Sequence, residues 1–364
     1  MKSCVGYAAF ESSGKLSTYN FDRREPQDDD VMLEILYSGV CHSDVHWVRA
    51  EWNPSPPYPL VPGHEIVGRV AEVGAKVTKI AVGDIAAVGV QVDSCGECKC
   101  CSDQRDDPQY CTKGVFTYAS PHGYPDSVES EKVTQGGYST RIVTREKFVF
   151  SVPPALHKNL AGVAPLLCAG ITTWAPLQYF AGGEAELRGK KLGVVGLGGL
   201  GHMAVKLGKA LGCHVTVLSS SESKRKAAID ELGADAYLVH KDKEAMKDAQ
   251  CSLDVVVDTV SADHDLEALV ALLDVGGKYL VVGLPPHKLA FKNSWFVNKK
   301  RMLGGTLIGG PVMTQDLLNF CAERGVYADI ELIKMDAIND AFERMLASDV
   351  KYRFVIDIAS SKLE

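Results

Sequence analysis

Residues Lys191–Arg225 read KLGVVGLGGLGHMAVKLGKALGCHVTVLSSSESKR, and this stretch decides the fold. Its apolar run from Leu192 to Val195 is short enough to be a strand buried on both faces. Three glycines then follow in the spacing G-x-G-x-x-G: Gly196, Gly198 and Gly201. A strand that runs directly into such a glycine turn is typical of the first half of a dinucleotide-binding unit.

A helix and a second strand complete this unit. Between Ala204 and Leu211, apolar and small residues recur at i, i+3, i+4 and i+7, which is the pattern of one helix face. The apolar run Val215–Leu218 then returns as a strand. The glycines permit a tight turn and let the backbone approach a pyrophosphate, and the helix start offers N–H groups to the phosphates. We predict a Rossmann-type, doubly wound parallel sheet; a glycine-rich packing turn is the alternative.

The end of the second strand favours NADP(H) over NAD. An NAD site usually carries Asp or Glu about 20 residues past the first glycine, to bind the ribose 2′-hydroxyl. Here the chain has Ser219, Ser220 and Ser221, with Lys224 and Arg225 just after. Hydroxyls and cations suit a 2′-phosphate, which a carboxylate would repel. Glu222 is the one residue that argues for NAD.

The whole chain has the composition of a globular protein of two domains. It has 364 residues, and its net charge of −7 without a basic face argues against nucleic acid as a partner. We find no apolar run of the roughly 20 residues that a membrane span needs, and no signal peptide. Eleven cysteines, many of them clustered, indicate thiolates in a reducing compartment, so we expect a cytoplasmic protein. The tripeptide Ser361–Leu363 resembles a peroxisomal address, but such signals are read only at the extreme C-terminus and Glu364 follows it here, so whether it acts as an address is left open.

The first 80 residues read as short strands separated by glycine and proline turns, as in a compact β-barrel. Cys41-His-Ser-Asp-Val-His46 and Gly63-His-Glu65 lie within this part. Cysteine and histidine are the preferred ligands of zinc, and a catalytic zinc keeps one position open. Taken alone, Cys41 is better explained as a small buried side chain, and His64 as a hydrogen-bonded core histidine.

A second group of cysteines reads Cys95-Gly-Glu-Cys98-Lys-Cys100-Cys101, with Cys111 further on. The spacing C-x2-C-x2-C followed by a fourth cysteine is typical of a closed tetrahedral zinc site. We predict that Cys95, Cys98, Cys101 and Cys111 bind a structural zinc, with Cys100 as a spare thiol. Disulfides are the alternative, and the missing secretory signal makes them a poor one.

Five separated motifs, in order, resemble the medium-chain zinc alcohol dehydrogenases. They are GHEIVG around His64, the four-cysteine segment, APLLCAGITT around Cys168, GLGGLG from Gly196, and YRFVID around Arg353. Within that family the chain is most similar to the cinnamyl-alcohol-dehydrogenase-like, NADPH-dependent aldehyde reductases. The resemblance covers essentially the whole chain. It departs at one place: Cys101 and Cys111 enclose nine residues where the family usually has seven.

The resemblance implies a GroES-like β-barrel catalytic domain with an inserted Rossmann-type domain. We expect the catalytic domain at residues 1–162, with its structural-zinc lobe at about 93–113. The NADP-binding domain is expected at 163–306, and a C-terminal segment at 307–364 completes the catalytic domain. A homodimer is implied by the family alone.

The resemblance also implies the roles of particular residues. The catalytic zinc ligands would be Cys41, His64 and Cys168. Glu65 would be a carboxylate that can approach the metal, and Asp44 would orient the histidine ligand. The proton relay would be Ser43 and His46. The residues expected to bind the cofactor are Thr172, Gly196, Leu197, Gly198, Gly199, Leu200, Gly201, Ser219, Ser220, Ser221, Lys224, Val282, Gly283 and Arg353.

The function expected on this basis is hydride transfer between NADP(H) and a primary alcohol or aldehyde, with two zinc ions per chain. An aromatic or allylic aldehyde would suit the family, and the identity of the natural one is left open. Trp52, Tyr118, Trp295 and Phe296 could line the substrate pocket or be plain core residues. Two alternatives are a zinc-independent reductase of enone double bonds and a non-catalytic nucleotide-binding protein of the same fold. The complete ligand and relay residues argue against both.

Overall fold

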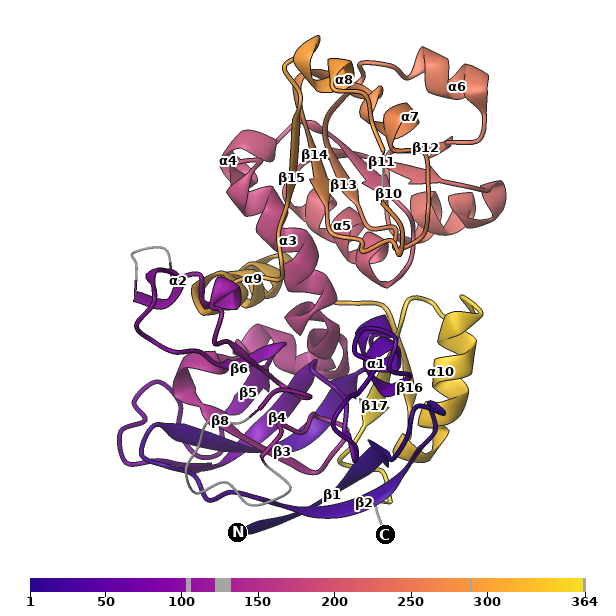
Figure 1. The fold of residues 1–364 in the computed structure, drawn as a ribbon. Coiled ribbons are helices and arrows are strands. Elements are labelled where there is room, and N and C mark those ends of the chain that lie inside the picture. The colour runs from indigo at the N-terminus through magenta and orange to yellow at the C-terminus, as the bar shows by residue number, and fades with distance from the viewer. Residues whose placement is uncertain (103–105, 122–131, 289, 363–364) are drawn as a thin grey trace. The chain divides into compact units, whose positions relative to one another are not determined.

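The computed structural model describes residues 1–102, 106–121, 132–288 and 290–362 (Figure 1). The chain divides into two compact units: Met1–Cys168 together with Gly310–Glu364, and Ala169–Gly309. The expected junctions, after 162 and 306, lie a few residues earlier. The first difference has a clear cause, because the 3-10 helix η5 (Ala161–Leu167) packs on strands of the first unit. Residues 103–105 of the expected zinc lobe, and Leu363 of the terminal tripeptide, lie outside the described residues.

The second unit is built on a six-stranded parallel sheet. Its strand order is β12-β11-β10-β13-β14-β15, so the chain begins in the middle and winds outward in both directions. The strands are β10 (Lys191–Val195), β11 (His214–Ser219), β12 (Ala236–Val239), β13 (Leu253–Asp258), β14 (Leu273–Val281) and β15 (Met302–Gly305). The predicted strands at Leu192–Val195 and Val215–Leu218 lie within β10 and β11.

Two helices, α3 (Ala169–Tyr179) and α4 (Gly183–Leu187), precede the first strand, β10. The segments that connect the strands contain α5 (Gly199–Ala210), η6 (Glu222–Lys224), the π-helix η7 (Ala227–Glu231), α6 (Lys243–Asp248), α7 (Leu266–Val270) and α8 (Ser294–Val297). The apolar run Leu266–Leu273 is divided between two of these elements. Helix α7 ends at Val270, and Leu273 pairs with Leu253 as the first residue of β14.

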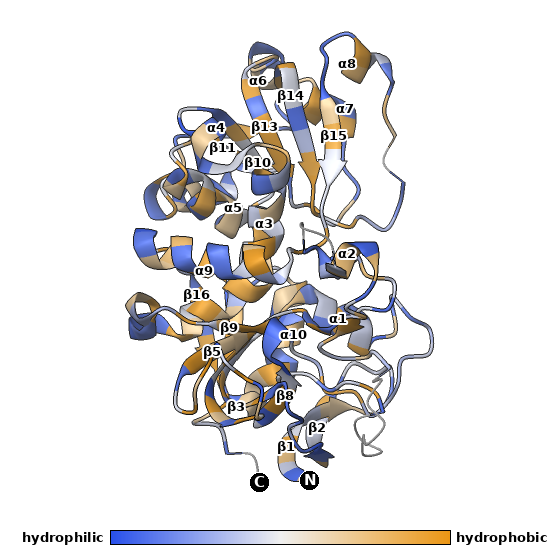
Figure 2. Ribbon diagram, turned by 90° about the vertical axis from the view of Figure 1, so that its left-hand side faces the viewer, coloured by the Kyte–Doolittle hydropathy of each residue, from blue (hydrophilic) through white to orange (hydrophobic). Residues whose placement is uncertain are grey.

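Apolar strand residues form the core of the second unit. Val195, Leu218, Val256 and Tyr279 are buried together, and the partly buried Trp295 and Phe296 pack against this cluster. Figure 2 shows hydrophobic residues in β13 and toward the end of β14. Trp295 and Phe296 are therefore core-packing residues in this unit, which is the plainer of the two interpretations that the sequence left open.

The first unit contains a seven-stranded mixed sheet and two small antiparallel pairs. The large sheet has the order β16-β17-β3-β4-β5-β9, and β8 pairs with β3. Its strands are β3 (Asp30–Gly39), β4 (Ile66–Val73), β5 (Ile85–Val88), β8 (Arg141–Arg145), β9 (Val149–Ser151), β16 (Ile330–Ile333) and β17 (Arg353–Asp357). The two pairs are β1 (Lys2–Ala9) with β2 (Leu16–Arg23), and β6 (Gln91–Asp93) with β7 (Val115–Phe116).

Helical segments of the first unit lie around these strands. They are α1 (His42–Val48), α2 (Lys99–Ser102), η1 (Pro108–Tyr110), η3 (Glu146–Phe148), η4 (Pro154–Asn159), η5, α9 (Pro311–Arg324), η8 (Met335–Ala337) and α10 (Ile338–Leu346). The tail strand β17 pairs with β3, which joins the C-terminal segment to the N-terminal sheet. Arg353, the first residue of β17, therefore lies in a strand that pairs with β3.

No helix in the described part of the chain combines the length and the apolar character that a membrane crossing requires.

Candidate active site and metal centres

Four side chains from three segments of the first unit converge on one buried point. Cys41 follows β3 and precedes α1, His64 and Glu65 precede β4, and Cys168 follows η5. One ligand atom from each residue lies within 4.8 Å of all the others, and all four residues are buried. The two sulfurs, of Cys41 and Cys168, are 3.9 Å apart. We call these four residues the buried ligand group.

Local backbone structure places the group. Cys41 is the N-cap residue of α1, and its backbone N–H donates to the Asp44 carboxylate at 2.9 Å, as in a capping box. The other oxygen of Asp44 accepts the Gly63 N–H at 3.1 Å, just before His64. Gly39, at the end of β3, is required by close approach, because a Cβ there would lie 2.0 Å from a carboxylate oxygen of Glu65. The Asp44 carboxylate therefore holds the backbone at Cys41 and directly before His64, two members of the buried ligand group.

Asp44 also orients the ring of His64. Its Oδ1 lies 3.3 Å from Nδ1 of His64, and Tyr138 donates its hydroxyl hydrogen to Oδ2 at 2.9 Å. The Tyr118 hydroxyl lies 3.3 Å from the same Nδ1. Burial opposes a charged ring, but the Asp44 carboxylate outweighs it and raises the pKa of His64 well above its ordinary value. Because Nδ1–H is held by a carboxylate, Nε2 remains as the ligand nitrogen.

Glu65 is held by an arginine from the far end of the chain. Arg353 forms a buried ion pair with Oε1 of Glu65. Oε2 of Glu65 is buried and has no hydrogen-bond partner among the residues described. Burial raises the pKa of Glu65 to about 7, although the nearby arginine charge works against that rise. One carboxylate oxygen is thus bound by arginine, and the other is buried without a hydrogen-bond partner among the described residues.

The two thiols of the ligand group have pKa values shifted in opposite directions. The hydrogen bond with Cys168, followed by the positive charge of Arg353, holds the pKa of Cys41 well below its usual range in spite of burial. The same hydrogen bond and burial raise the pKa of Cys168. Thiolate sulfur, imidazole nitrogen and carboxylate oxygen are the ligands that zinc takes, so these residues fit a zinc ion. With Glu65 bound to Arg353, three ligands remain, which is the number in catalytic zinc sites.

The four cysteines predicted for structural zinc form a second group. The sulfurs of Cys95, Cys98, Cys101 and Cys111 all lie within 4.8 Å of one another. Neighbouring sulfurs are separated by 3.4 to 3.9 Å, for example 3.5 Å between Cys111 and Cys95. Tetrahedral zinc with Zn–S bonds of about 2.3 Å puts its sulfurs roughly 3.8 Å apart, so the group fits zinc. No disulfide joins any of the eleven cysteines, all of which are described.

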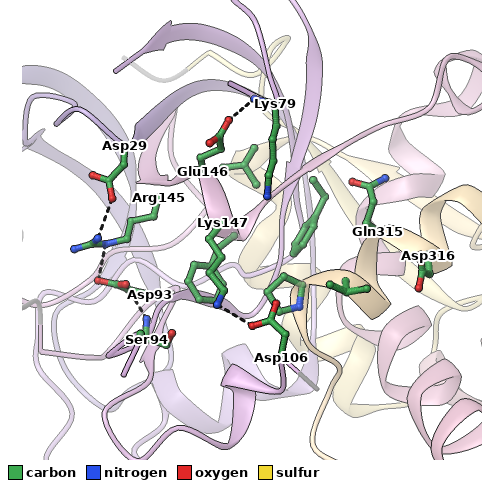
Figure 3. Close-up of a pocket in the computed structure, with 16 residues that line it drawn as sticks. Asp29, Lys79, Asp93, Ser94, Asp106, Arg145, Glu146, Lys147, Gln315 and Asp316 are labelled. Atoms are coloured by element: carbon green, nitrogen blue, oxygen red, sulfur yellow. Dashed lines mark hydrogen bonds and ion pairs between the residues drawn. The ribbon is translucent and has the colours of Figure 1, made fainter. Parts of the chain in front are cut away.

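Ion pairs hold the segment that carries these cysteines against the sheet. A hollow of about 620 Å³ lies here, and Figure 3 shows its charged lining. Arg145 of β8 binds Asp29 at 2.9 Å and Asp93 at 3.0 Å. Lys147 binds Asp106 at 2.8 Å. Asp93 and Asp106 lie on either side of the first three cysteines in the sequence, so both ends of that stretch are fixed.

The second unit carries the predicted glycine turn between β10 and α5. Gly196 has a φ of +85°, which favours glycine, and a Cβ on Gly201 would lie 2.2 Å from the Gly196 carbonyl oxygen. Gly198 is the N-cap residue of α5, and Gly199 and Leu200 form its first turn. The N–H groups of this turn have no partner within the helix, which is the arrangement that binds phosphate.

The residues after β11 lie close to this turn. Lys224 donates from Nζ to the carbonyl oxygen of Leu197 at 2.9 Å, so a cation sits at the glycine turn. Glu222 is bound by Arg225 through both carboxylate oxygens, at 2.5 and 2.8 Å. The residue that argued for NAD is therefore paired with a neighbouring cation. Ser219 is buried at the end of β11, whereas Ser220 and Ser221 are exposed.

The predicted relay residues lie on α1 but are not bonded to each other. Ser43 Oγ is 3.6 Å from the Cys41 sulfur. His46 is bound at Nδ1 by Glu51 and stacks on Trp52, with ring centres 4.8 Å apart. No hydrogen bond joins Ser43 to His46, both of which are described. Relay hydrogen bonds are often incomplete without substrate, so the relay stays a prediction.

Other predicted cofactor residues are distributed over both units. Thr172 is half-buried on α3, and Val282 and Gly283 follow β14, where both backbone N–H groups donate to the Asp258 carbonyl oxygen. Arg353 lies on Glu65, and a contact with cofactor remains a prediction for it.

Three residues of the site were not assigned from the sequence. Tyr138 bonds to Asp44, Tyr118 lies against His64, and Glu51 binds His46. For Tyr118 the sequence indicates only an aromatic side chain that could line the substrate pocket or belong to the core. The spacing of five between His46 and Glu51 is a signal that could have been read, whereas the tyrosines lie too far along the chain for any spacing to indicate their contacts.

Comparison with known proteins agrees with this arrangement. The family "Alcohol dehydrogenase GroES-like domain" matches residues 27–154, and "Zinc-binding dehydrogenase" matches residues 199–323. Probable mannitol dehydrogenase 1 of Stylosanthes humilis is 50% identical over 98% of this chain and 96% of its own length.

Solved structures are also similar to this chain over nearly its whole length. A cinnamyl alcohol dehydrogenase of Sorghum bicolor has a TM-score of 0.93 at 45% identity, covering 100% of this chain and 99% of that one. A CAD from Helicobacter pylori, complexed with NADP(H), has a TM-score of 0.87 at 36% identity and covers 99% of both chains. These matches confirm the predicted fold class, a GroES-like domain with an inserted Rossmann-type domain. The chain belongs to the zinc-binding alcohol dehydrogenase family, whose two domain models match it in order.

Proposed function

We propose that this enzyme transfers hydride between NADP(H) and a primary alcohol or aldehyde of aromatic or allylic character, in the direction of aldehyde reduction. The observation that carries the proposal is the buried ligand group, in which Cys41, His64 and Cys168 converge beside the Glu65–Arg353 pair. A binding protein has no need of such a group.

Zinc bound by these three residues would act as a Lewis acid on the carbonyl oxygen of the substrate. The chain's own residues do the rest. Asp44 fixes the tautomer and direction of the His64 ring, and the burial of all four residues keeps bulk water from their ligand atoms. Ser43, whose hydroxyl lies beside the Cys41 sulfur, would supply the proton that the product oxygen needs.

The second unit supports NADP(H) as the hydride donor. The glycine turn at the start of α5 suits a pyrophosphate, and the serines after β11 with Lys224 suit a 2′-phosphate. Pairing with Arg225 removes much of the charge of Glu222 that would repel that phosphate. The Helicobacter pylori relative complexed with NADP(H) is consistent with this choice.

Aromatic side chains around the ligand group favour an aromatic substrate over a sugar alcohol. The Tyr118 ring lies 5.6 Å from the His64 ring, and Trp47 meets Tyr118 edge-on at 6.4 Å. Such rings offer apolar faces, whereas a polyol needs several hydrogen-bond partners. Relatives carry names of both kinds, cinnamyl alcohol dehydrogenase and probable mannitol dehydrogenase.

One assay tests the proposed function against its alternatives. Zinc-loaded enzyme is incubated with NADPH and cinnamaldehyde, and the product is identified. Cinnamyl alcohol is the expected product. Hydrocinnamaldehyde would mean reduction of the double bond, no turnover with any aldehyde would mean a binding protein, and faster oxidation of mannitol than of cinnamyl alcohol would overturn the aromatic assignment. His64→Ala should abolish activity while NADPH binding persists.

We also propose a cytoplasmic homodimer. The edge strand β15 pairs with β14 on one side, and its Met302 and Leu303 side chains are 45% and 40% exposed. An uncharged, apolar edge of this kind is expected to be covered by another strand, and β15 of a second copy would extend the sheet. Light scattering should give twice the chain mass of 39.3 kDa, and Leu303→Lys should yield monomers. A monomeric wild type would rule out the dimer.

The cytoplasmic location is supported by the grouped free thiols, which suit a reducing compartment.

A further inference from the structure

A buried hydrogen-bonded cluster lies at the end of β13, apart from any residue assigned to metal. Asp258, whose side chain is 1% exposed, accepts three hydrogen bonds. They come from the Tyr279 hydroxyl at 2.9 Å, from Nε2 of His264 at 2.8 Å and from the Val260 backbone N–H at 3.1 Å. The cluster therefore links the end of the strand to the segment that follows it.

Both ring nitrogens of His264 face acceptors. Nε2 faces the Asp258 carboxylate, and Nδ1 lies 2.8 Å from the carbonyl oxygen of Ala262. Neither acceptor carries a hydrogen, so both contacts are hydrogen bonds only when the ring is doubly protonated. The hydrogen bond to Asp258 raises the pKa of His264, although burial opposes it. The His264 side chain is 6% exposed and Asp258 is buried, so water does not readily replace the bond between them, whereas the contact with Ala262 lies at the surface.

The segment closed by these bonds, Thr259–Asp263, packs against the predicted dinucleotide site. A Cβ on Gly196 would lie 2.9 Å from a methyl group of Val260, and one on Gly283 would lie 2.3 Å from the Val260 carbonyl oxygen. Thr259 donates its hydroxyl hydrogen to the Val195 carbonyl oxygen at 2.7 Å, directly before the glycine turn. The segment thus touches Gly196 and Gly283, two of the glycines that are expected to bind the cofactor.

Other charged groups around His264 do not replace it. Asp263 is paired with His287 at 2.7 Å on the surface, and Asp265 caps α7. Burial, and then the positive charge of His264, lower the pKa of His240. Lys241 adds a further positive charge beside His240. Tyr279 is buried with its pKa raised well above the usual value, so its hydroxyl stays protonated as a donor.

We propose that His264 is a positioning residue that, when charged, fixes Thr259–Asp263 against the glycine turn and so makes the affinity for NADP(H) depend on pH. This inference rests on the proposed NADP(H) function. A neutral ring can donate only one hydrogen bond, so either Ala262 or Asp258 loses its bond when the proton leaves. The segment is then held less firmly against Gly196 and Gly283, and the cofactor binds a less ordered site.

The test compares wild type with His264→Gln between pH 6.5 and pH 9, in holoenzyme with saturating aldehyde. Gln can donate to Asp258 but does not titrate. The KM for NADPH should rise about fivefold with pH in wild type relative to the variant, as expected for one net hydrogen bond, with kcat ratios unchanged. Titration of the 2′-phosphate affects both proteins equally and cancels in the ratio. His214→Gln, an exposed histidine at the start of β11, serves as the matched control and should follow wild type.

A second measurement uses wild type alone and covers the case in which His264→Gln does not fold. If NADPH prefers the charged ring, binding must raise the pKa of His264, because linkage is reciprocal. NMR of histidine-labelled protein should show that one buried imidazole titrates higher with NADPH than without it. Equal pH dependence of the NADPH KM in wild type and variant, or a buried imidazole that NADPH does not shift, would overturn the inference. NADPH that binds neither protein at any pH would instead overturn the proposed function.

Discussion

Arg353, the first residue of β17, forms an ion pair with Glu65, which lies immediately before β4, and both side chains are buried. The pair joins the C-terminal segment to the start of the chain at the point where the ligand group converges. It also determines how Glu65 behaves, because it binds one carboxylate oxygen and leaves the other without a hydrogen-bond partner among the described residues.

Arg353→Met should therefore destabilise the protein strongly. Loss of the guanidinium leaves a buried carboxylate without its partner, which typically costs about 3–5 kcal/mol. Urea unfolding of zinc-loaded enzyme measures the change. Arg145→Met is the matched control: this arginine also forms two ion pairs, but it is 37% exposed, so its loss should cost about 1 kcal/mol or less. Equal losses for the two variants would contradict a special role for the buried pair.

The local parts of the fold and site could be predicted from the sequence. The strand, glycine turn and helix from Lys191 onward depend on residues close together in the chain, and α5 begins at Gly199, within the glycine motif. Likewise the spacing of Cys95, Cys98, Cys101 and Cys111 indicated one group, and the structure brings their sulfurs together. Residues that lie close together in the sequence must fit one local structure, so their spacing can be recognised in the sequence.

Contacts between distant residues leave no such pattern. Glu65 and Arg353 are 288 positions apart, and Asp44 and Tyr138 are 94 apart. Their pairing depends on β17 lying beside β3 and on the path of the chain before β8, neither of which periodicity can show. The end of α7 has a similar cause. The apolar run of this helix continues to Leu273, but Leu273 pairs with Leu253 of β13 and so belongs to β14.

Replacing one cysteine of the second group should remove one zinc. Cys98→Ser should lower the zinc content from two ions per chain to one and reduce thermal stability, because structural zinc contributes directly to folding. Cys100→Ser, which changes the neighbouring spare thiol, should keep both ions. Elemental analysis measures the content. Two ions in Cys98→Ser would show that Cys98 is not a ligand, and one ion in Cys100→Ser would show that Cys100 is a ligand and not a spare thiol.

Releasing Glu222 should shift the cofactor preference toward NADH. Arg225→Ala removes the partner that holds both oxygens of Glu222, so its charge would repel a 2′-phosphate. The ratio of kcat/KM for NADPH over NADH should fall about tenfold, and Ser219→Asp should lower it further. Arg188→Ala breaks a similar pair with Glu184 on α4 and should leave the ratio unchanged. A wild type that prefers NADH would refute the cofactor assignment.

The stability of the cofactor-free protein should depend on His264 in a definite direction. Its folded pKa is raised above the unfolded value of about 6.5, so its contribution is complete below that value. The contribution is then lost as the pH rises through the folded pKa. Wild type should therefore lose more stability than His264→Gln between pH 6 and pH 9, measured as the difference in urea midpoint. A larger loss in the variant would mean that the ring is neutral in the folded protein.

His46 should matter most for alcohol oxidation at low pH. His46 is partly exposed, with Nδ1 bound by Glu51 and the ring stacked on Trp52, so it lies where a proton can reach solvent. If Ser43 passes the proton outward to His46, His46→Gln should slow oxidation by about 10²-fold where external base is scarce. Added imidazole should restore part of the rate, and zinc content should stay full because His46 lies outside the ligand group.

Two variants serve as controls for this prediction. Glu51→Gln keeps the His46 ring in place and should slow oxidation less. His157→Gln, at a histidine bonded to the Val152 carbonyl, should not slow it. A variant that loses stability but keeps the wild-type pH–rate profile would mean that His46 only packs against Trp52.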